Sequence, residues 1–156
     1  MQMPQPTEHH QRLRRFVGSW RGREKMHPSP WDPNPSEADS VLEGRLDLDG
    51  LVLITNYRQL KDGATTFRGH GVYGYDPKLE RYTMYWFDSG SYHPGGAVLG
   101  RWEGDVLTYE RTNERGTSRY IYTLGDDDHY DFAIEMSEDG RSFQRWMDST
   151  WTRATP

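Results

Sequence analysis

The sequence contains no cysteine, and this absence excludes several kinds of chemistry. Disulfides, thiolate catalysis and cysteine-based zinc or iron–sulfur sites all need that side chain. A reducing compartment agrees with this composition, and we expect a cytoplasmic protein. Long apolar runs are also missing. No stretch reaches the length of a transmembrane helix, and the first 20 residues lack the apolar segment of a signal peptide. We therefore expect no membrane partner.

Aliphatic residues and phenylalanine are scarce, since Leu, Ile, Val and Phe together number 25 of 156 residues. So small a share is typical of disordered chains. The net charge of −5 is modest, however, and six Trp and ten Tyr supply large surfaces that can be buried. We expect one folded domain over residues 1–156, with a core built largely from these rings. Such rings can fill an ordinary core or border a partly wet cavity.

Motifs for phosphate, nucleic acid or metal binding are absent or weak. The local basic cluster between Arg12 and Lys25 is too small to predict a nucleic-acid partner. The segment GHGVYG, residues 69–74, lacks the spacing and the following helix of a dinucleotide site. His70, His93 and Asp88 can meet at one end of the fold, either as solvated side chains or as a metal or acid–base site. We assign no metal and no cofactor.

Turn signals divide most of the chain into strands. Residues 7–17 form the one predicted helix, with Thr7 as N-cap and Gly18 as its end, after a flexible segment at residues 1–6. Beyond it, X-Gly pairs such as Asp49-Gly50 and Asp62-Gly63 are typical of tight hairpins. We predict about ten strands, at residues 19–27, 39–48, 51–60, 64–75, 81–88, 96–103, 105–113, 117–124, 129–136 and 142–153.

Short connections make consecutive strands antiparallel neighbours. A meander of ten strands has to curl or close, and closure removes its exposed edges. The predicted fold is therefore an all-β, up-and-down barrel with a short N-terminal helix. Residues 27–37 contain four prolines and are predicted to form a lid or mouth loop. Residues 89–96 are a second, shorter candidate for such a loop.

The order of several segments carries a family resemblance. The segments are LRRFVGSWRG, LDGLVLITNY, FRGHGVYGYDPKLERYTMYWFDS, GRWEGDVLTYE and RWMDSTWTR. This arrangement resembles DUF1579, a family of uncharacterised bacterial lipocalin-like (calycin) proteins, over nearly all of the chain. The resemblance implies a calycin barrel with a central cavity and implies no particular activity. Related nitrobindin-like barrels bind haem through a histidine near the C-terminal end, whereas no histidine follows His129 here.

Alternation along the first and last strands predicts which charges point inward. Arg21, Arg23 and Lys25 form one charged face, so Glu24 on the opposite face is predicted to point inward. In the last strand we assign Arg145 to the inner face with Phe143, Met147 and Trp151. Glu24 and Arg145 would then be neighbours, either as an internal salt bridge or with Arg145 free to bind a ligand carboxylate. Arg153 is expected to pack against Trp20 at the closed end, as in lipocalins.

The ring-rich stretch at residues 67–90 is predicted to be two strands covered on both sides. Tyr73, Trp86 and Asp88 are assigned to the inner face. The outer face would meet the helix or a second subunit, which allows for a homodimer. The glycines fit either strong curvature or places where rings cross bare backbone. Trp102 and Tyr122 are assigned inward from the alternation of their own strands.

Three functions stay open at this point. The first is a binding protein for a small, mostly apolar ligand, with Tyr73, Trp86, Trp102 and Tyr122 as contacts and with Arg145 and Asp88 for orientation. The second is a lyase or isomerase acting on a small aromatic or unsaturated acid, as in phenolic acid decarboxylases. Glu24, Arg145 and Tyr122 would then serve as acid, anchor and phenol donor. The third is a filled barrel that acts through its surface.

Overall fold

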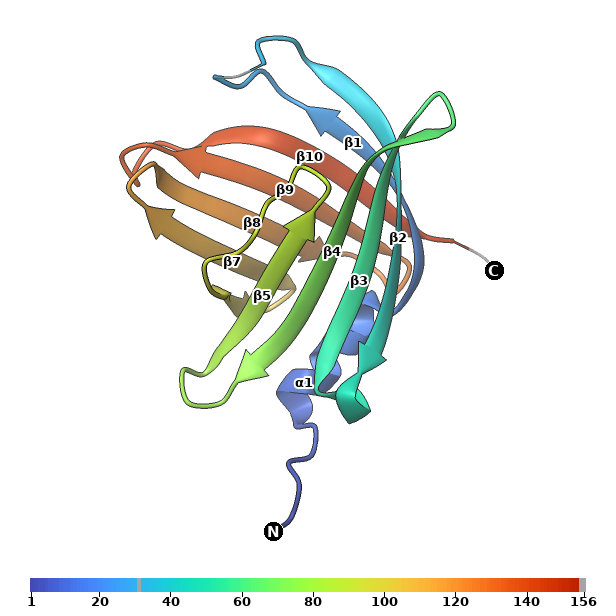
Figure 1. Cartoon of the computed structure of the whole chain (residues 1–156), viewed down its shortest axis with the longest axis vertical. Helices are drawn as coiled ribbons and strands as arrows, with labels where there is room; N and C mark the ends of the chain where they lie inside the picture. Colours follow the sequence, from blue (N-terminus) through green and yellow to red (C-terminus); the bar gives the residue numbers. More distant parts are fainter. Residues whose placement is uncertain (31, 155–156) are drawn as a thin grey trace.

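The computed structural model describes residues 1–30 and 32–154, which form one closed antiparallel barrel (Figure 1). Consecutive strands are neighbours, and β1 pairs with β10 to close the barrel. The predicted all-β barrel is confirmed, and one strand coincides with its predicted bounds. The strands are β1 Gly18–Met26, β2 Ser36–Asp47, β3 Val52–Lys61, β4 Ala64–Asp76, β5 Arg81–Asp88, β6 Val98–Glu103, β7 Val106–Asn113, β8 Gly116–Leu124, β9 His129–Ser137 and β10 Gln144–Arg153.

The N-terminal helix is shorter than predicted. It consists of α1, Glu8–Arg12, followed by a 3₁₀ turn, η1, at Leu13–Phe16. Thr7 is the N-cap, as expected, and its hydroxyl accepts a hydrogen bond from the His9 amide at 3.3 Å. Residues three apart lie on the same side of a 3₁₀ helix, so Leu13 and Phe16 both point into the barrel. No helix within the described residues is long and apolar enough to cross a membrane.

The hairpin turns follow the predicted X-Gly pairs. Between β3 and β4, Asp62 and Gly63 have φ of 52° and 77°, as a tight two-residue hairpin turn requires. Between β2 and β3, Asp49 and Gly50 also have positive φ, within a short 3₁₀ turn, η2, at Leu48–Gly50. The residues that adopt positive φ in these turns therefore determine where the flanking strands end.

Several glycines lie directly beneath aromatic rings. A Cβ added to Gly69 would come within 2.0 Å of the Trp86 ring, and one added to Gly100 within 2.6 Å of the Tyr109 ring. Cβ atoms do not tolerate such approaches. The glycines of the ring-rich strands thus let large side chains cross bare backbone, which was one of the two predicted reasons for them.

The closed end of the barrel is sealed by Trp20 and Arg153, as predicted. The Arg153 guanidinium lies 4.2 Å from the centroid of the Trp20 ring. It also donates to the Val17 carbonyl at 2.5 Å, while Trp20 Nε1 donates to the Phe16 carbonyl at 3.1 Å. These bonds fasten the turn after the helix to both β1 and β10, because the two residues are register partners on those strands.

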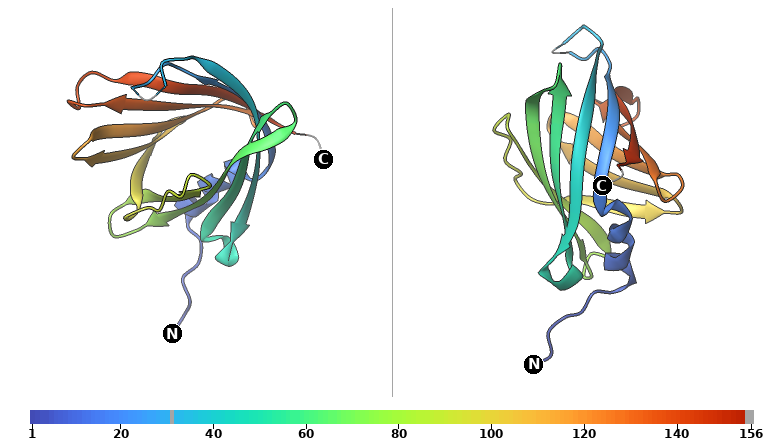
Figure 2. Two further views of the ribbon diagram at one scale, coloured as in Figure 1. Left: turned by 45° about the horizontal axis from the view of Figure 1, so that its top comes forward. Right: turned by 90° about the vertical axis from the view of Figure 1, so that its right-hand side faces the viewer.

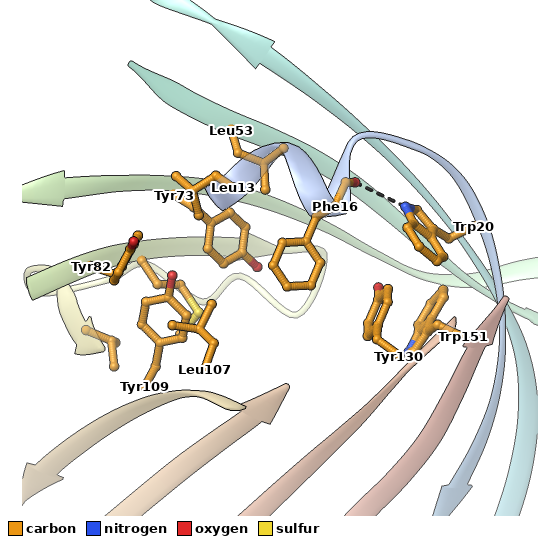
Figure 3. Close-up of a cluster of buried hydrophobic side chains, with 12 residues drawn as sticks. Leu13, Phe16, Trp20, Leu53, Tyr73, Tyr82, Leu107, Tyr109, Tyr130 and Trp151 are labelled. Atoms are coloured by element: carbon orange, nitrogen blue, oxygen red, sulfur yellow. Dashed lines mark hydrogen bonds between the residues drawn. The ribbon is translucent and has the colours of Figure 1, made fainter. Parts of the chain in front are cut away.

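One half of the interior is filled by side chains, and we call it the closed half (Figure 3). Leu13 and Phe16 enter it from the helix side and pack among rings from the strands. The remaining space beside them is only about 20 Å³, which is about the room that one water needs. The buried members of this cluster are Leu13, Phe16, Trp20, Leu53, Tyr73, Tyr82, Met84, Val98, Leu107, Tyr109, Tyr130 and Trp151.

The other half of the interior lies away from the helix, and we call it the open half. The connections after β1 (residues 27–35) and after β5 (residues 89–97) both reach this end (Figure 2), as predicted for mouth loops. Trp31, within the first loop, lies outside the described residues. Several inward-facing side chains here are only partly buried, so this end of the interior is accessible to solvent. They are Tyr57, Trp86, Asp88, Arg111, Tyr120, Phe132, Ile134 and Met147.

The outer face beside β5 is not covered by the helix. Tyr85 and Phe87 point outward and are each 41% exposed, and Leu99 on β6 is 37% exposed. The sequence predicted that a helix or a second subunit covers this side. Within the described chain the helix packs at the closed end instead, so the homodimer stays a prediction.

Candidate functional site in the open half of the barrel

Glu24 is a fully buried carboxyl group above the filled core. It lies on the inner face of β1, as predicted, between Ala38 of β2 and Ser149 of β10, and only 1% of it is exposed. The hydroxyl of Tyr57 donates a hydrogen bond of 2.5 Å to Glu24 Oε1. Ser40 Oγ in turn donates to the Tyr57 hydroxyl at 3.3 Å. The three residues form a short polar chain across β1, β2 and β3.

Burial raises the pKa of Glu24 to about 7, although the hydrogen bond from Tyr57 acts in the opposite direction. Burial and the neighbouring Glu24 carboxylate also raise the pKa of Tyr57. No cation of the described chain forms an ion pair with Glu24. At neutral pH the carboxyl is therefore divided between its acid and its anion, and it can donate or accept a proton.

The predicted pairing of Glu24 with Arg145 is wrong. A bulge in β10 between Arg145 and Met147 inserts one extra residue and reverses the alternation. Met147 and Trp151 keep the predicted inward direction, but Arg145 pairs in register with outward-facing Glu135. On that outer face its guanidinium lies 2.8 Å from Asp148 and 3.5 Å from Glu135. Phe143, also assigned inward, lies instead beneath outward-facing Arg119.

Trp86 and Asp88 lie on the inner face of β5, as predicted. Trp86 Nε1 donates to Asp88 Oδ2 at 3.1 Å, and the Trp86 ring lies 6.0 Å from the Tyr57 ring. Glu24, Trp86 and Asp88 are thus connected through Tyr57, which the sequence analysis missed. Its strand was not assigned by parity, because its segment LVLIT is apolar at every position but the last. Pairing with Leu42 of β2 is what directs Tyr57 inward.

Tyr73, Trp102 and Tyr122 point inward, but they belong to the closed half. The hydroxyls of Tyr73 and Tyr122 lie 3.3 Å apart, and burial raises the pKa of both groups. Trp102 packs against Phe16, with the Arg12 guanidinium 4.4 Å from its ring centroid. The structure therefore separates these three residues from Glu24 and Trp86 and uses them as core.

An inward-facing cation was also missed. Arg111 shares the inner face of β7 with Leu107 and Tyr109, both of which are buried, and its register partner is Ser118. The alternation in VLTYERTN could have revealed this position, because Leu107, Tyr109 and Arg111 occupy every second place. Arg111 lies toward the open end, beyond the filled cluster.

His70 and Asp88 lie on opposite faces of the sheet, so they do not form the acid–base or metal site considered above. His70 points outward and bonds to Asn56 at 2.8 Å, and His93 packs beside Phe87. Over residues 1–30 and 32–154 no group of three or more metal-ligating side chains comes together.

A groove of about 900 Å³ crosses the outer face of β1–β5. Long charged side chains line part of its walls, and its apolar contributors are Trp20, Val41, Tyr57, Phe87 and Ala154. Sites for small molecules bury most of the ligand among apolar residues. The lining of this groove mixes charged side chains with apolar surface, and it includes Tyr57 and Asp88. The inner face of the open half carries partly buried rings. The groove's other main lining residues are Arg21, Glu43, Arg58, Arg68 and His70.

Comparison with known proteins places the fold. A family model described as "Protein of unknown function (DUF1579)" matches residues 5–153. The chain belongs to the DUF1579 family. No curated protein matches this DUF1579 protein by sequence. Solved structures of similar fold include two that are both less than 25% identical to it, so they agree with it in fold alone.

The first of these structures is Rv2717c from M. tuberculosis, 18% identical, with a TM-score of 0.62 over 93% of this chain and 96% of that one. The second is the S-type phycobiliprotein lyase CPES from Guillardia theta, 12% identical, with a TM-score of 0.68 over 98% of this chain and 99% of that one. Both comparisons span nearly the whole barrel of the DUF1579 protein.

Proposed function

We propose that the protein binds a small, mostly apolar molecule in the open half of its barrel. The observation that carries this proposal is the set of inward-facing rings toward the open end that remain partly exposed, Tyr57, Trp86, Tyr120 and Phe132, three of which also pack against the filled cluster. When an apolar ligand replaces the water next to an inward-facing ring, apolar surface of both is buried, and this burial favours binding. The closed half beneath is filled, so a ligand would rest on this core and not pass through it.

The polar groups beside these rings would orient the ligand. Binding sites combine apolar walls with a few placed polar groups. Here Glu24 and Tyr57 supply a buried carboxyl and a hydroxyl held by one hydrogen bond, and Asp88 supplies a carboxylate beside Trp86. Glu24 is only 1% exposed, so it would act on the ligand through the hydroxyl of partly buried Tyr57, to which it is hydrogen-bonded.

Titration with N-phenyl-1-naphthylamine, a neutral apolar fluorophore, tests this proposal. Trp86→Ala should weaken binding roughly tenfold, because an aromatic contact is worth about 1 kcal/mol or more. Phe87→Ala is the matched control, since Phe87 is the next residue on the same strand and faces outward. The proposal fails if neither this probe nor an anionic probe of the same skeleton shows saturable binding, or if Phe87→Ala weakens binding as much as Trp86→Ala.

A second candidate is proton transfer on a small aromatic or unsaturated acid, as a lyase or isomerase. The raised pKa of Glu24 favours it, because a general acid–base works best with a pKa near the working pH. Tyr57 would be the phenol beside it, in place of the originally predicted Tyr122.

Deuterium exchange separates this candidate from simple binding. Small unsaturated and aromatic acids would be incubated with the protein in heavy water and examined by NMR. A catalyst should incorporate deuterium at carbon, and Glu24→Gln should abolish the incorporation while Glu103→Gln, on an exposed position of β6, leaves it intact. Failure of the wild-type protein to incorporate deuterium would leave binding as the function.

A further inference from the structure

Arg111 is a cation on the inner face of the barrel. On β7 it follows Leu107 and Tyr109 at every second position, and those two residues are 1% and 0% exposed. The same alternation points Arg111 inward, one step closer to the open end. Its guanidinium is close enough to Tyr120 of β8 to oppose the rise that burial causes in the pKa of that phenol.

This cation has no anionic partner in the described part of the chain. Arg111 Nε is buried and makes no hydrogen bond there, and the hydrogen bond from Nη1 goes to the Tyr92 hydroxyl. Arg119, on the outer face of β8, shows the contrast, because it pairs with Glu110 at 2.7 Å. A guanidinium carries five N–H donors, so most of the hydrogen-bonding capacity of Arg111 is unused.

Asp88, a carboxylate on the inner face of β5, is already engaged. Asp88 Oδ2 accepts from Trp86 Nε1, and Oδ1 accepts from the amides of Gly90 at 2.9 Å and Tyr92 at 3.4 Å. Asp88 therefore shapes the loop after β5 and does not form an ion pair with Arg111. The result is that the loop carries Tyr92 onto the guanidinium, whose carbon lies 5.5 Å from the ring centroid.

Tyr92 is a contact that a ligand can replace. The ring is 36% exposed, and it belongs to a connecting loop rather than to the sheet. Its neutral hydroxyl is a weaker partner for a guanidinium than an anionic oxygen, because the anion adds charge–charge attraction to the hydrogen bond. Planar guanidinium groups suit carboxylates and similar oxyanions especially well, since two parallel N–H donors can bind two oxygens.

We propose that Arg111 binds the acidic group of the ligand, so that the protein selects apolar anions over neutral apolar molecules of the same shape. The apolar body of the ligand would lie against Trp86 and Phe132, and its oxyanion would take the place of the Tyr92 hydroxyl. This inference rests on the proposed function, because it assigns the ligand class of the same site.

Two fluorophores with one skeleton test the inference. 1-Anilinonaphthalene-8-sulfonate carries an anionic group that N-phenyl-1-naphthylamine lacks. Wild-type protein should bind the anion more tightly, and Arg111→Gln should weaken anion binding roughly tenfold or more while changing binding of the neutral probe less than about twofold. Arg111→Lys keeps the charge and should restore part of the preference. Arg101→Gln removes an exposed, outward-facing arginine from β6 and should change neither affinity.

The outcomes separate this inference from the proposed function. If the neutral probe binds and Trp86→Ala weakens it, but Arg111→Gln leaves the anion affinity unchanged, the anion receptor is wrong and the apolar site stands. If Arg111→Gln weakens both probes equally, Arg111 acts only by packing, and the inference is again wrong. If neither probe shows saturable binding, the proposed function itself fails, and the inference fails with it.

Discussion

The two halves of the barrel interior are lined by similar side chains and yet are packed differently. In the closed half Tyr109 is 0% exposed and Trp20 is 1% exposed, whereas Tyr57 and Trp86 in the open half keep part of their surface accessible. Both halves are walled by the same strands. The difference comes from the N-terminal segment, because Leu13 and Phe16 fill one end and nothing equivalent from the described chain fills the other. Rings therefore stabilise one half and stay partly exposed in the other.

Truncating one tryptophan in each half should give the largest contrast. Trp20→Ala removes a ring held by Arg153, Tyr130 and the Phe16 carbonyl, and it should lower the free energy of unfolding by about 3–5 kcal/mol. Trp86→Ala removes a partly exposed ring and should cost only about 1–2 kcal/mol. Urea unfolding measures both values.

Trp20→Phe keeps an aromatic ring and serves as a fallback if Trp20→Ala does not fold. It should still cost more than Trp86→Phe. Equal losses for the two tryptophans would mean that the halves do not differ in packing, and the division of the interior would have to be abandoned.

Glu24 lies between the closed half and the open half. The pH dependence of stability that it causes should show whether water reaches its carboxyl group. Below about pH 4.5 the carboxyl is protonated in both the folded and the unfolded protein, so burial carries no charge penalty. Between pH 4.5 and about 7 the folded state retains the proton, so the free energy of unfolding falls as the pH rises. The full loss relative to Glu24→Gln should be about 3 kcal/mol above pH 7.

Urea unfolding of wild type and Glu24→Gln between pH 4 and about 8.5 would measure this difference. Glu103→Gln is the control, since Glu103 is exposed on β6 and should show no such trend. A difference that stays constant across this range would show that water reaches Glu24 and that its pKa is ordinary.

The barrel was predicted well from the sequence, because hairpin turns and the alternation of inward and outward side chains depend on residues that are close together in the chain. Glu24, Trp20 and Arg153 were placed correctly from alternation and strand order. Arg145 was misplaced, since one bulge in β10 reverses the direction of its side chain and leaves no mark on the hydrophobic pattern. The arginine that does point inward is Arg111. The alternation along its strand predicts this direction, but it was not applied to that strand.

The sequence pattern of the individual strands could not predict that side chains fill the closed half. Tyr73 and Tyr122 were correctly assigned inward, but they do not border the open half. What separates them from it is Leu13 and Phe16, which reach them only after the helix has packed into the barrel. Tyr57 was missed for a related reason, because its direction depends on pairing with β2 and not on its own segment.

The smallest expected effect comes from one substitution made in both halves. Gly100→Ala would place a methyl group 2.6 Å from the Tyr109 ring, which is fully buried and has no room to move. Gly69→Ala would create an even closer contact, 2.0 Å, with the Trp86 ring, but that ring borders the open half and can turn outward. We therefore expect Gly100→Ala to cost about 2–3 kcal/mol and Gly69→Ala about 1 kcal/mol, although the static clash predicts the opposite order.

Gly96→Ala, with no atom within 4 Å of the added methyl, should be nearly neutral and controls for the glycine-to-alanine change itself. A displaced Trp86 should also shift the tryptophan emission of Gly69→Ala toward longer wavelength, because the ring gains contact with water. If Gly69→Ala proves the costlier of the two, the Trp86 ring is as confined as Tyr109, and the open half has less room for a ligand than proposed.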